Sequence, residues 1–216
     1  MNSENSLKDY IPNIINEQGI STKDLLDYIV QDSLSNFNEL IKWTDEDYKT
    51  YNSMLEKAQN IDNSLTTKEI GDLLEDLVCF IIRKTYFFEV IKNVRTKTNE
   101  IDQYISLSKK GIQALKLFSL DKKLLVLPVD GFLGECKNYK ENISVTWIGK
   151  FYGLLKTCNC DFGIIFSLKK LTGSFNNWSD AYGLLRSIVL IEKYESKKDF
   201  YIIDFGINEF NSIKEG

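Results

Sequence analysis

From Thr66 onward the sequence alternates between helical and strand periodicity, and this alternation restricts the fold more than any other feature. After Thr66 the apolar residues recur every three or four positions, as in a helix with one buried face. Segment 161–166 is instead a short, continuous apolar run, typical of a buried parallel strand. Helix 144–157 separates this run from strand 132–139, which makes a β-α-β crossover. The predicted strands are 87–91, 100–107, 132–139, 161–166 and 200–205, and another helix covers 180–194. We therefore predict an α/β fold: a mixed sheet with helices on both sides.

The first 63 residues differ from the rest of the chain in charge and in pattern. They carry 5 basic and 12 acidic residues, and they contain two helix starts, at 21–24 and 44–47. The acidic residues at 44–47 suit the positive end of a helix dipole. We predict a helical accessory extension over residues 1–63 and the main domain over residues 64–216. Because the extension is acidic, we expect it to pack, bind a partner or regulate rather than contact nucleic acid.

Residues 108–131 show no clear period. Two polar pieces, 109–111 and 121–123, are typical of turns that flank short apolar segments. We predict an insertion between two strands here and assign it no fold.

The chain contains no histidine, which excludes several kinds of catalytic site at once. Serine–histidine and cysteine–histidine hydrolases and histidine-ligated zinc enzymes all need that residue. Acid–base chemistry must then use carboxylates, lysines, tyrosines or metal-bound water. A zinc site would require Cys79 and Cys136, which lie in apolar segments, to meet Cys158 and Cys160. We instead expect reduced thiols and a cytoplasmic location.

The net charge is −4, which argues against a protein that coats nucleic acid in general. The charge is uneven, however, because residues 64–175 carry 17 basic and 12 acidic residues. This excess is compatible with phosphate contacts, although a solvated surface of mixed charge explains it almost as well. No apolar run is long enough to span a bilayer, so we expect no membrane partner.

Three acidic residues and one lysine form the candidate site. Glu75 lies at the border of the apolar face of its helix, where a salt-bridged glutamate would be the ordinary interpretation. Asp102 lies at the start of a strand. Glu135 and Lys137 are two residues apart on the next strand, so their side chains share one face while Cys136 packs on the other. Carboxylates and an amine on neighbouring strands can hold a divalent metal against a phosphodiester.

Each residue of this set has a chemical role to offer. Asp102 and Glu135 suit direct metal ligands, with the Cys136 carbonyl as a third, and Glu75 could hold a second metal or a water of the outer sphere. Mg²⁺ bound in this way lowers the pKa of its water and clamps phosphate oxygens. Lys137 could orient or deprotonate the attacking water, or stabilise the charge at phosphorus.

The order of these residues resembles the PD-(D/E)XK nuclease superfamily. Ile70-Gly71-Asp72-Leu73-Leu74-Glu75-Asp76-Leu77-Val78 is similar to its first core helix, and segment 95–102, ending in Glu100-Ile101-Asp102, to its hairpin. Gly134-Glu135-Cys136-Lys137 is similar to its catalytic strand. Segment 161–167 resembles the next strand in Mrr-like restriction endonucleases and Holliday-junction resolvases. The resemblance covers residues 66–205 and implies a restriction-endonuclease-like sheet. It also implies an active site made of Glu75, Asp102, Glu135 and Lys137.

These features predict a metal-dependent endonuclease that hydrolyses phosphodiester bonds, in DNA by preference, for restriction, defence or repair. Mg²⁺ is the expected cofactor, Mn²⁺ can substitute for it, and no organic cofactor is expected. One chain holds one site, so cleavage of both strands would need a homodimer or two nicks. The alternative is a non-catalytic subunit of a larger defence complex that binds nucleic acid or protein through the same fold. An RNA-directed nuclease is a third possibility, because these residues do not discriminate the sugar.

Several aromatic residues follow the candidate site in the sequence. Trp147, Phe175, Trp178 and Tyr182 could stack on bases. Packing in the core or between elements is the more frequent role of such residues, and we favour it.

Overall fold

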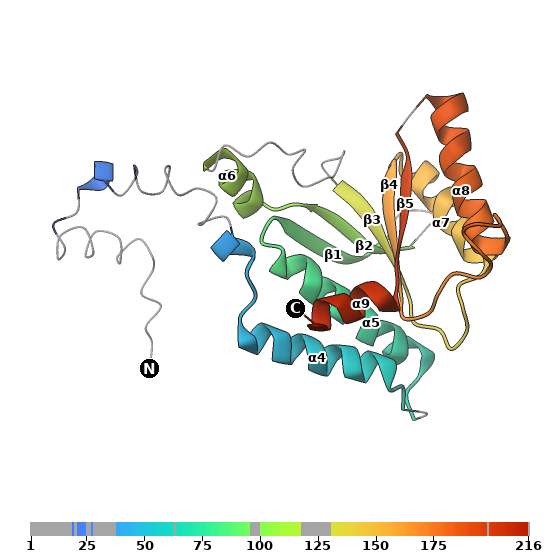
Figure 1. Ribbon diagram of the computed structural model, residues 1–216, viewed down its shortest axis with the longest axis horizontal. Helices are drawn as coiled ribbons and strands as arrows, with labels where there is room; N and C mark the ends of the chain where they lie inside the picture. The colour runs from blue at the N-terminus through green and yellow to red at the C-terminus, as the bar shows by residue number, and fades with distance from the viewer. Residues whose placement is uncertain are drawn as a thin grey trace.

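The computed structural model describes residues 19, 21–24, 27, 38–62, 64–95, 100–117, 131–197 and 199–215. These residues form a mixed five-stranded sheet that is flanked by helices on both faces (Figure 1). The predicted α/β class is confirmed at this level.

The sheet has the strand order β1-β2-β3-β4-β5. Its antiparallel half consists of β1 (Phe88–Arg95), β2 (Glu100–Leu107) and β3 (Gly131–Lys137). Its parallel half continues from β3 to β4 (Phe162–Ser167) and β5 (Tyr201–Phe205). The predicted crossover is confirmed, since α7 (Val145–Thr157) connects β3 to β4. Because β3 and β4 are parallel, the chain leaves both strands at the same edge of the sheet.

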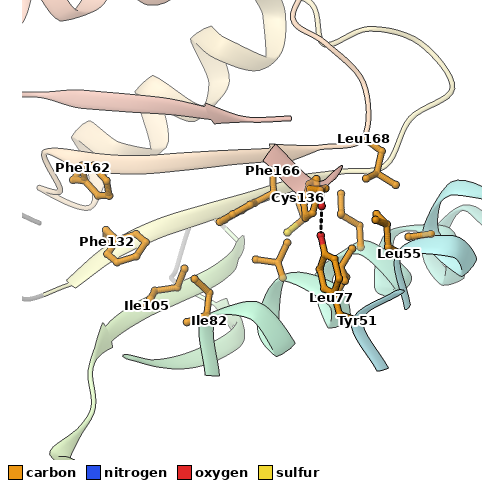
Figure 2. Close-up of a cluster of buried hydrophobic side chains, with 14 residues drawn as sticks. Tyr51, Leu55, Leu77, Ile82, Ile105, Phe132, Cys136, Phe162, Phe166 and Leu168 are labelled. Carbon is orange, nitrogen blue, oxygen red and sulfur yellow. Dashed lines mark hydrogen bonds between the residues drawn. The ribbon is translucent and has the colours of Figure 1, made fainter. Parts of the chain in front are cut away.

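One face of the sheet is covered by α5 (Thr67–Lys84), on which α4 (Asp45–Gln59) packs. α9 (Ile207–Glu215) lies beside α4 and β5 (Figure 1). Figure 2 shows the apolar cluster between these helices and the sheet, in which side chains of α4 and α5 meet those of β2, β3 and β4. Tyr51 of α4 is fully buried there, and its hydroxyl donates to the carbonyl oxygen of Phe210 at 2.6 Å. α4 therefore shares one core with the sheet, while the boundary drawn at residue 63 stays a prediction.

Both helices on this face begin as the sequence predicts. Thr44 caps α4 and Thr66 caps α5, each with a side-chain oxygen that accepts from a backbone N–H three residues later. The reciprocal bond comes from Asp47 and Glu69, whose carboxylates accept the N–H of the capping threonine. These capping boxes satisfy N–H donors that would otherwise be unpaired in the first turn, and they fix the residue at which each helix begins.

The opposite face of the sheet is covered by α7 and α8 (Asp180–Ile191). The two helices are joined by a buried carboxylate, Glu192, of which 2% is exposed. The Tyr152 hydroxyl donates to Glu192 Oε1 at 2.5 Å, and the Lys156 ammonium donates to Oε2 at 2.9 Å. These bonds lower the pKa of Glu192 to about 2, the hydrogen bond from Tyr152 contributing most. The buried charge is thus paired rather than isolated.

The predicted turn at 109–111 is wrong, because these residues begin a helix, α6 (Lys109–Leu117). Its glycine is required by a close contact and not by a turn. A Cβ on Gly111 would lie 2.2 Å from the carbonyl oxygen of Phe87, so only glycine lets α6 approach the start of β1. Sequence patterns carry no record of such an approach.

The C-terminal half contains two further elements that the sequence pattern did not indicate. α8 ends earlier than predicted and passes into a π-helical turn, η2 (Glu192–Ser196). The first residue of this turn is Glu192, which accepts the hydrogen bond from Tyr152. α9 follows β5 and buries Phe210. The predicted turn at 121–123 lies outside the described residues.

Candidate active site

The candidate site lies where β2 and β3 stop pairing. The last backbone pair of the two strands is Gln103 with Gly134. Asp102, the residue before Gln103 in the chain, lies just beyond this pair. Its carboxylate Oδ2 accepts the backbone N–H of Cys136 at 3.0 Å. The side chain of Asp102 therefore replaces a missing backbone bond, which holds the carboxylate beside β3 rather than in solvent.

Lys137 brings the two predicted ligand carboxylates together. Its ammonium nitrogen lies 2.6 Å from Glu135 Oε1 and 3.5 Å from Asp102 Oδ2. The three side chains are largely buried, with 12–20% of each exposed. The Lys137 ammonium also lies 4.8 Å from the centre of the Trp147 ring on α7, a cation–π contact. The structure thus places three of the four predicted residues in one cluster.

Burial and charge shift the pKa values of this cluster. Burial raises the pKa of Glu135, and the negative charge of Asp102 raises it further, against the opposing effect of Lys137. Burial by itself lowers the pKa of Lys137, but the charges of Glu135 and Asp102 outweigh it, so the pKa is raised. Lys137 is therefore an ammonium ion near neutral pH and suits charge stabilisation better than proton abstraction.

Glu75 reaches the site from α5. Its Oε2 atom is buried and forms an ion pair with the Lys92 ammonium at 3.2 Å. Lys92 also donates to Asp76 at 2.8 Å. Burial raises the pKa of Glu75, Lys92 opposes this effect, and the charge of Asp102 adds to it. Glu75 therefore lies within electrostatic reach of Asp102, and its buried carboxylate is paired with Lys92.

Two buried amides set the position of α5, and the sequence analysis did not single them out. Gln103 is fully buried, and its Nε2 donates to the carbonyl oxygen of Glu75 at 3.1 Å. Asn138 follows β3, and its Nδ2 donates to the carbonyl oxygens of Ala58 and Ile70 at 3.2 and 3.0 Å. For Gln103, the sequence offers one signal of this role: it is a polar residue at a strand position that faces the core, where a polar group needs a hydrogen-bond partner.

These side chains border two hollows. A cleft of about 630 Å³ contains Glu75, Asp102 and Lys137, together with polar residues of α5, β1 and the segment after β3. A second hollow of about 420 Å³ lies against α7 and contains Glu135. Glu100 lines both. The Lys137 cluster therefore separates two accessible spaces, and an extended substrate could reach it from either side.

The donor set suits a hard divalent cation only in part. Asp102 and Glu135 offer carboxylate oxygens, and Mg²⁺ is commonly held by one or two carboxylates with water as the remaining ligands. Within the described part of the chain, no three Cys, Asp or Glu side chains are arranged to hold a metal together. Glu75 and the Cys136 carbonyl therefore stay predicted ligands. All four cysteines are free thiols.

No protein-family model, curated protein sequence or solved structure matches this chain. The assignment to the restriction-endonuclease-like fold thus stays a prediction beyond the α/β class. In the described residues, no helix has the length and apolarity needed to cross a membrane.

Proposed function

We propose that this chain is a metal-dependent endonuclease that hydrolyses phosphodiester bonds, in DNA by preference. The observation that carries the proposal is the cluster in which Lys137 meets Glu135 and Asp102, at 2.6 and 3.5 Å. The order of these residues in the sequence indicates the same phosphodiester chemistry. A chance Glu-x-Lys pair would have no reason to meet an aspartate from another strand.

The side chains divide the work of such a reaction. Asp102 and Glu135 would hold Mg²⁺ or Mn²⁺, which when bound supplies an activated water and a clamp on phosphate oxygens. Asp102 is held in place by the N–H of Cys136, and so is available without reorganisation. The Lys137 ammonium would contact a phosphate oxygen on which negative charge develops. Glu75, which lines the same cleft as Asp102 and Lys137, would hold a water or a second cation.

The alternative is a non-catalytic subunit that binds nucleic acid or protein through this fold. One contact favours it. The Lys137 ammonium lies within ion-pair distance of both carboxylates, so the cluster is already neutralised in part by the chain itself. In a protein without catalytic activity, the ion pairs of Lys137 with Glu135 and Asp102 would serve the fold alone.

Cleavage assays separate the two functions. The wild type would be incubated with supercoiled plasmid, single-stranded DNA, branched DNA and RNA, each with Mg²⁺, with Mn²⁺ or with a chelator. We expect cleavage only with metal, and none by Asp102→Asn or Lys137→Met. Glu89→Gln serves as the control, because Glu89 is an exposed carboxylate on β1 outside both hollows. Intact substrates with folded wild-type protein, or equal cleavage by all variants, would reject the nuclease.

A further inference from the structure

Two exposed aromatic rings project from the loop 172–179, which precedes α8. Phe175 is 56% exposed and Trp178 is 44% exposed. The guanidinium carbon of Arg186, on α8, lies 4.3 Å from the centre of the Phe175 ring and 4.0 Å from that of Trp178. Phe175, Trp178 and Arg186 thus form an aromatic–cation platform on the surface.

The loop holds this platform in one conformation. Arg186 Nη1 donates to the carbonyl oxygen of Phe175 at 2.6 Å. The N–H of Ser174 donates to Ser179 Oγ at 3.0 Å, and the N–H of Ser179 returns a bond to Ser174 O at 3.3 Å. The rings are therefore held by backbone and side-chain bonds, and not by burial.

The backbone is strained at the same place. Trp178 has φ +52° and Asp180 has φ +50°, in the left-handed region that costs an L residue about 1 kcal/mol. A tryptophan gains nothing intrinsic from this conformation. Asp180 begins α8 directly afterwards. This turn leads directly into α8 and leaves Trp178 at the surface.

Packing inside the chain leaves part of each of these rings uncovered. Phe175 has an edge contact with Tyr182 at 6.3 Å between centroids, and Arg186 lies between Phe175 and Trp178. Roughly half of each ring still faces solvent. The packing role expected from sequence fits Trp147, which contacts Lys137 and Tyr139, better than it fits Phe175 and Trp178.

The platform belongs to the sheet edge that carries the candidate site. Lys137 at the end of β3 pairs in register with Ser167 at the end of β4. The two chain segments then continue side by side, since Ile143 forms a parallel bridge with Leu171, just before the loop. Figure 1 shows both connections leaving the sheet at this edge, below α7 and α8.

The segment that contains the platform is basic, in a chain whose net charge is −4. Residues 168–187 contain three basic residues and one acidic residue. Lys169 and Lys170 are exposed where the chain enters the loop, and Arg186 lies in the platform itself. Aromatic faces beside cations complement a nucleotide, because the bases stack on the rings and the phosphates meet the lysines.

We propose that the platform binds an unpaired nucleobase by stacking and so directs the enzyme to nucleic acid with a single-stranded part. This inference rests on the proposed function and adds a substrate class to it. Bases inside a duplex are already stacked on each other and cannot use the platform, whereas those at a branch, a gap or a free strand can.

Binding without cleavage tests the platform directly. Fluorescein-labelled single-stranded DNA, single-stranded RNA and blunt duplex DNA would be titrated with the full chain in the presence of a chelator, and anisotropy measured. Trp178→Gly is the informative variant, since glycine adopts the left-handed backbone without strain while the ring is lost. Trp178→Phe keeps a ring. Tyr194→Ala is the matched control, because Tyr194 is 73% exposed outside the platform.

We expect Trp178→Gly and Phe175→Ala to weaken binding of single strands about tenfold and to leave duplex binding unchanged. Trp178→Phe and Tyr194→Ala should bind nearly as the wild type does. Equal binding of single strands by wild type and Trp178→Gly would overturn the proposal. Equal weakening for duplex, or a wild type that binds no single strand, would also overturn it.

The outcome is independent of catalysis. A platform that discriminates single strands in a protein that cleaves nothing would leave this inference standing and reject the nuclease. Cleavage that needs Asp102 but is indifferent to Trp178 on every substrate would do the reverse.

Discussion

The carboxylate of Asp102 accepts the backbone N–H of Cys136 at 3.0 Å, immediately beyond the last backbone pair of β2 and β3. The two strands separate there, and a side chain continues the hydrogen bonding that the backbones no longer provide. This arrangement fixes one predicted ligand against the strand that carries the other two members of the cluster, Glu135 and Lys137. Stability and chemistry consequently depend on different properties of the same residue.

Substitutions at Asp102 should separate these two properties. Asparagine keeps an acceptor for the Cys136 N–H but lacks the charge, whereas alanine lacks both. We expect Asp102→Ala to lower the free energy of unfolding by about 1–2 kcal/mol, and Asp102→Asn by clearly less. Both should lose metal-dependent cleavage. Urea denaturation measures the first effect, and equal stability of the two variants would contradict the role of the hydrogen bond.

Gln103 should act as a positioning residue for Glu75. Gln103→Leu removes the donor to the Glu75 carbonyl, but it also removes an Oε1 atom that is buried without a partner. These effects oppose each other, so we expect stability to change by less than about 1 kcal/mol. The loss of this contact should still shift α5 and with it Glu75. Because a small misplacement of a catalytic group has a large effect on rate, we expect kcat to fall about ten- to hundredfold with KM nearly unchanged.

Gln113→Leu provides the comparison for this variant. Gln113 is exposed on α6, away from the site, and the same substitution there should leave kcat unchanged. A Gln103→Leu protein with wild-type kcat would show that the contact serves packing only.

Asp204 should make the stability of the fold depend on pH. Burial raises its pKa to about 6, with the charge of Glu209 adding to the effect, and its Oδ1 has no partner. The native state therefore binds the proton more tightly than the unfolded chain, whose value is near 3.8. The stabilisation is complete below about pH 4 and is lost as the pH rises through about 6.

Asp204→Asn removes this dependence. At pH 7 the variant should be more stable than the wild type by about 1 kcal/mol, a figure reduced for the partial exposure of the carboxylate. The advantage should disappear at pH 4. Thermal unfolding at both pH values measures it, and a variant that is less stable at pH 7 than at pH 4, relative to wild type, would contradict the sign.

A pair of glycine substitutions should have opposite effects on stability. Gly111→Ala places a Cβ 2.2 Å from the carbonyl oxygen of Phe87, so α6 must move, and we expect a loss of about 2 kcal/mol or more. Gly153, within α7, has nothing within 4 Å of a built Cβ. Gly153→Ala should therefore stabilise by up to about 1 kcal/mol. Chemical denaturation of both proteins gives the comparison, and similar changes in the two would contradict it.

Local signals explain why much of the fold was predictable. The capping boxes at Thr44 and Thr66 and the apolar run 161–166 each depend on residues close in sequence. The helix at 109–117 was missed because the contact that requires its glycine, with Phe87, lies more than twenty residues away in the chain. α9 has only a weak helical pattern of apolar residues. It is held by Phe210, whose carbonyl oxygen accepts a hydrogen bond from Tyr51, a residue far away in the sequence.

The sequence by itself determined the α/β class, the order of the main elements and the residue types available for chemistry, because periodicity, capping and the absence of histidine are local properties. Only the tertiary structure decided that Lys137 lies between Asp102 and Glu135, that Gln103 supports Glu75, and that Phe175 and Trp178 remain exposed beside Arg186. These relations join strands and helices through the register of the sheet and through side-chain packing. Such long-range contacts leave no periodic trace in the chain.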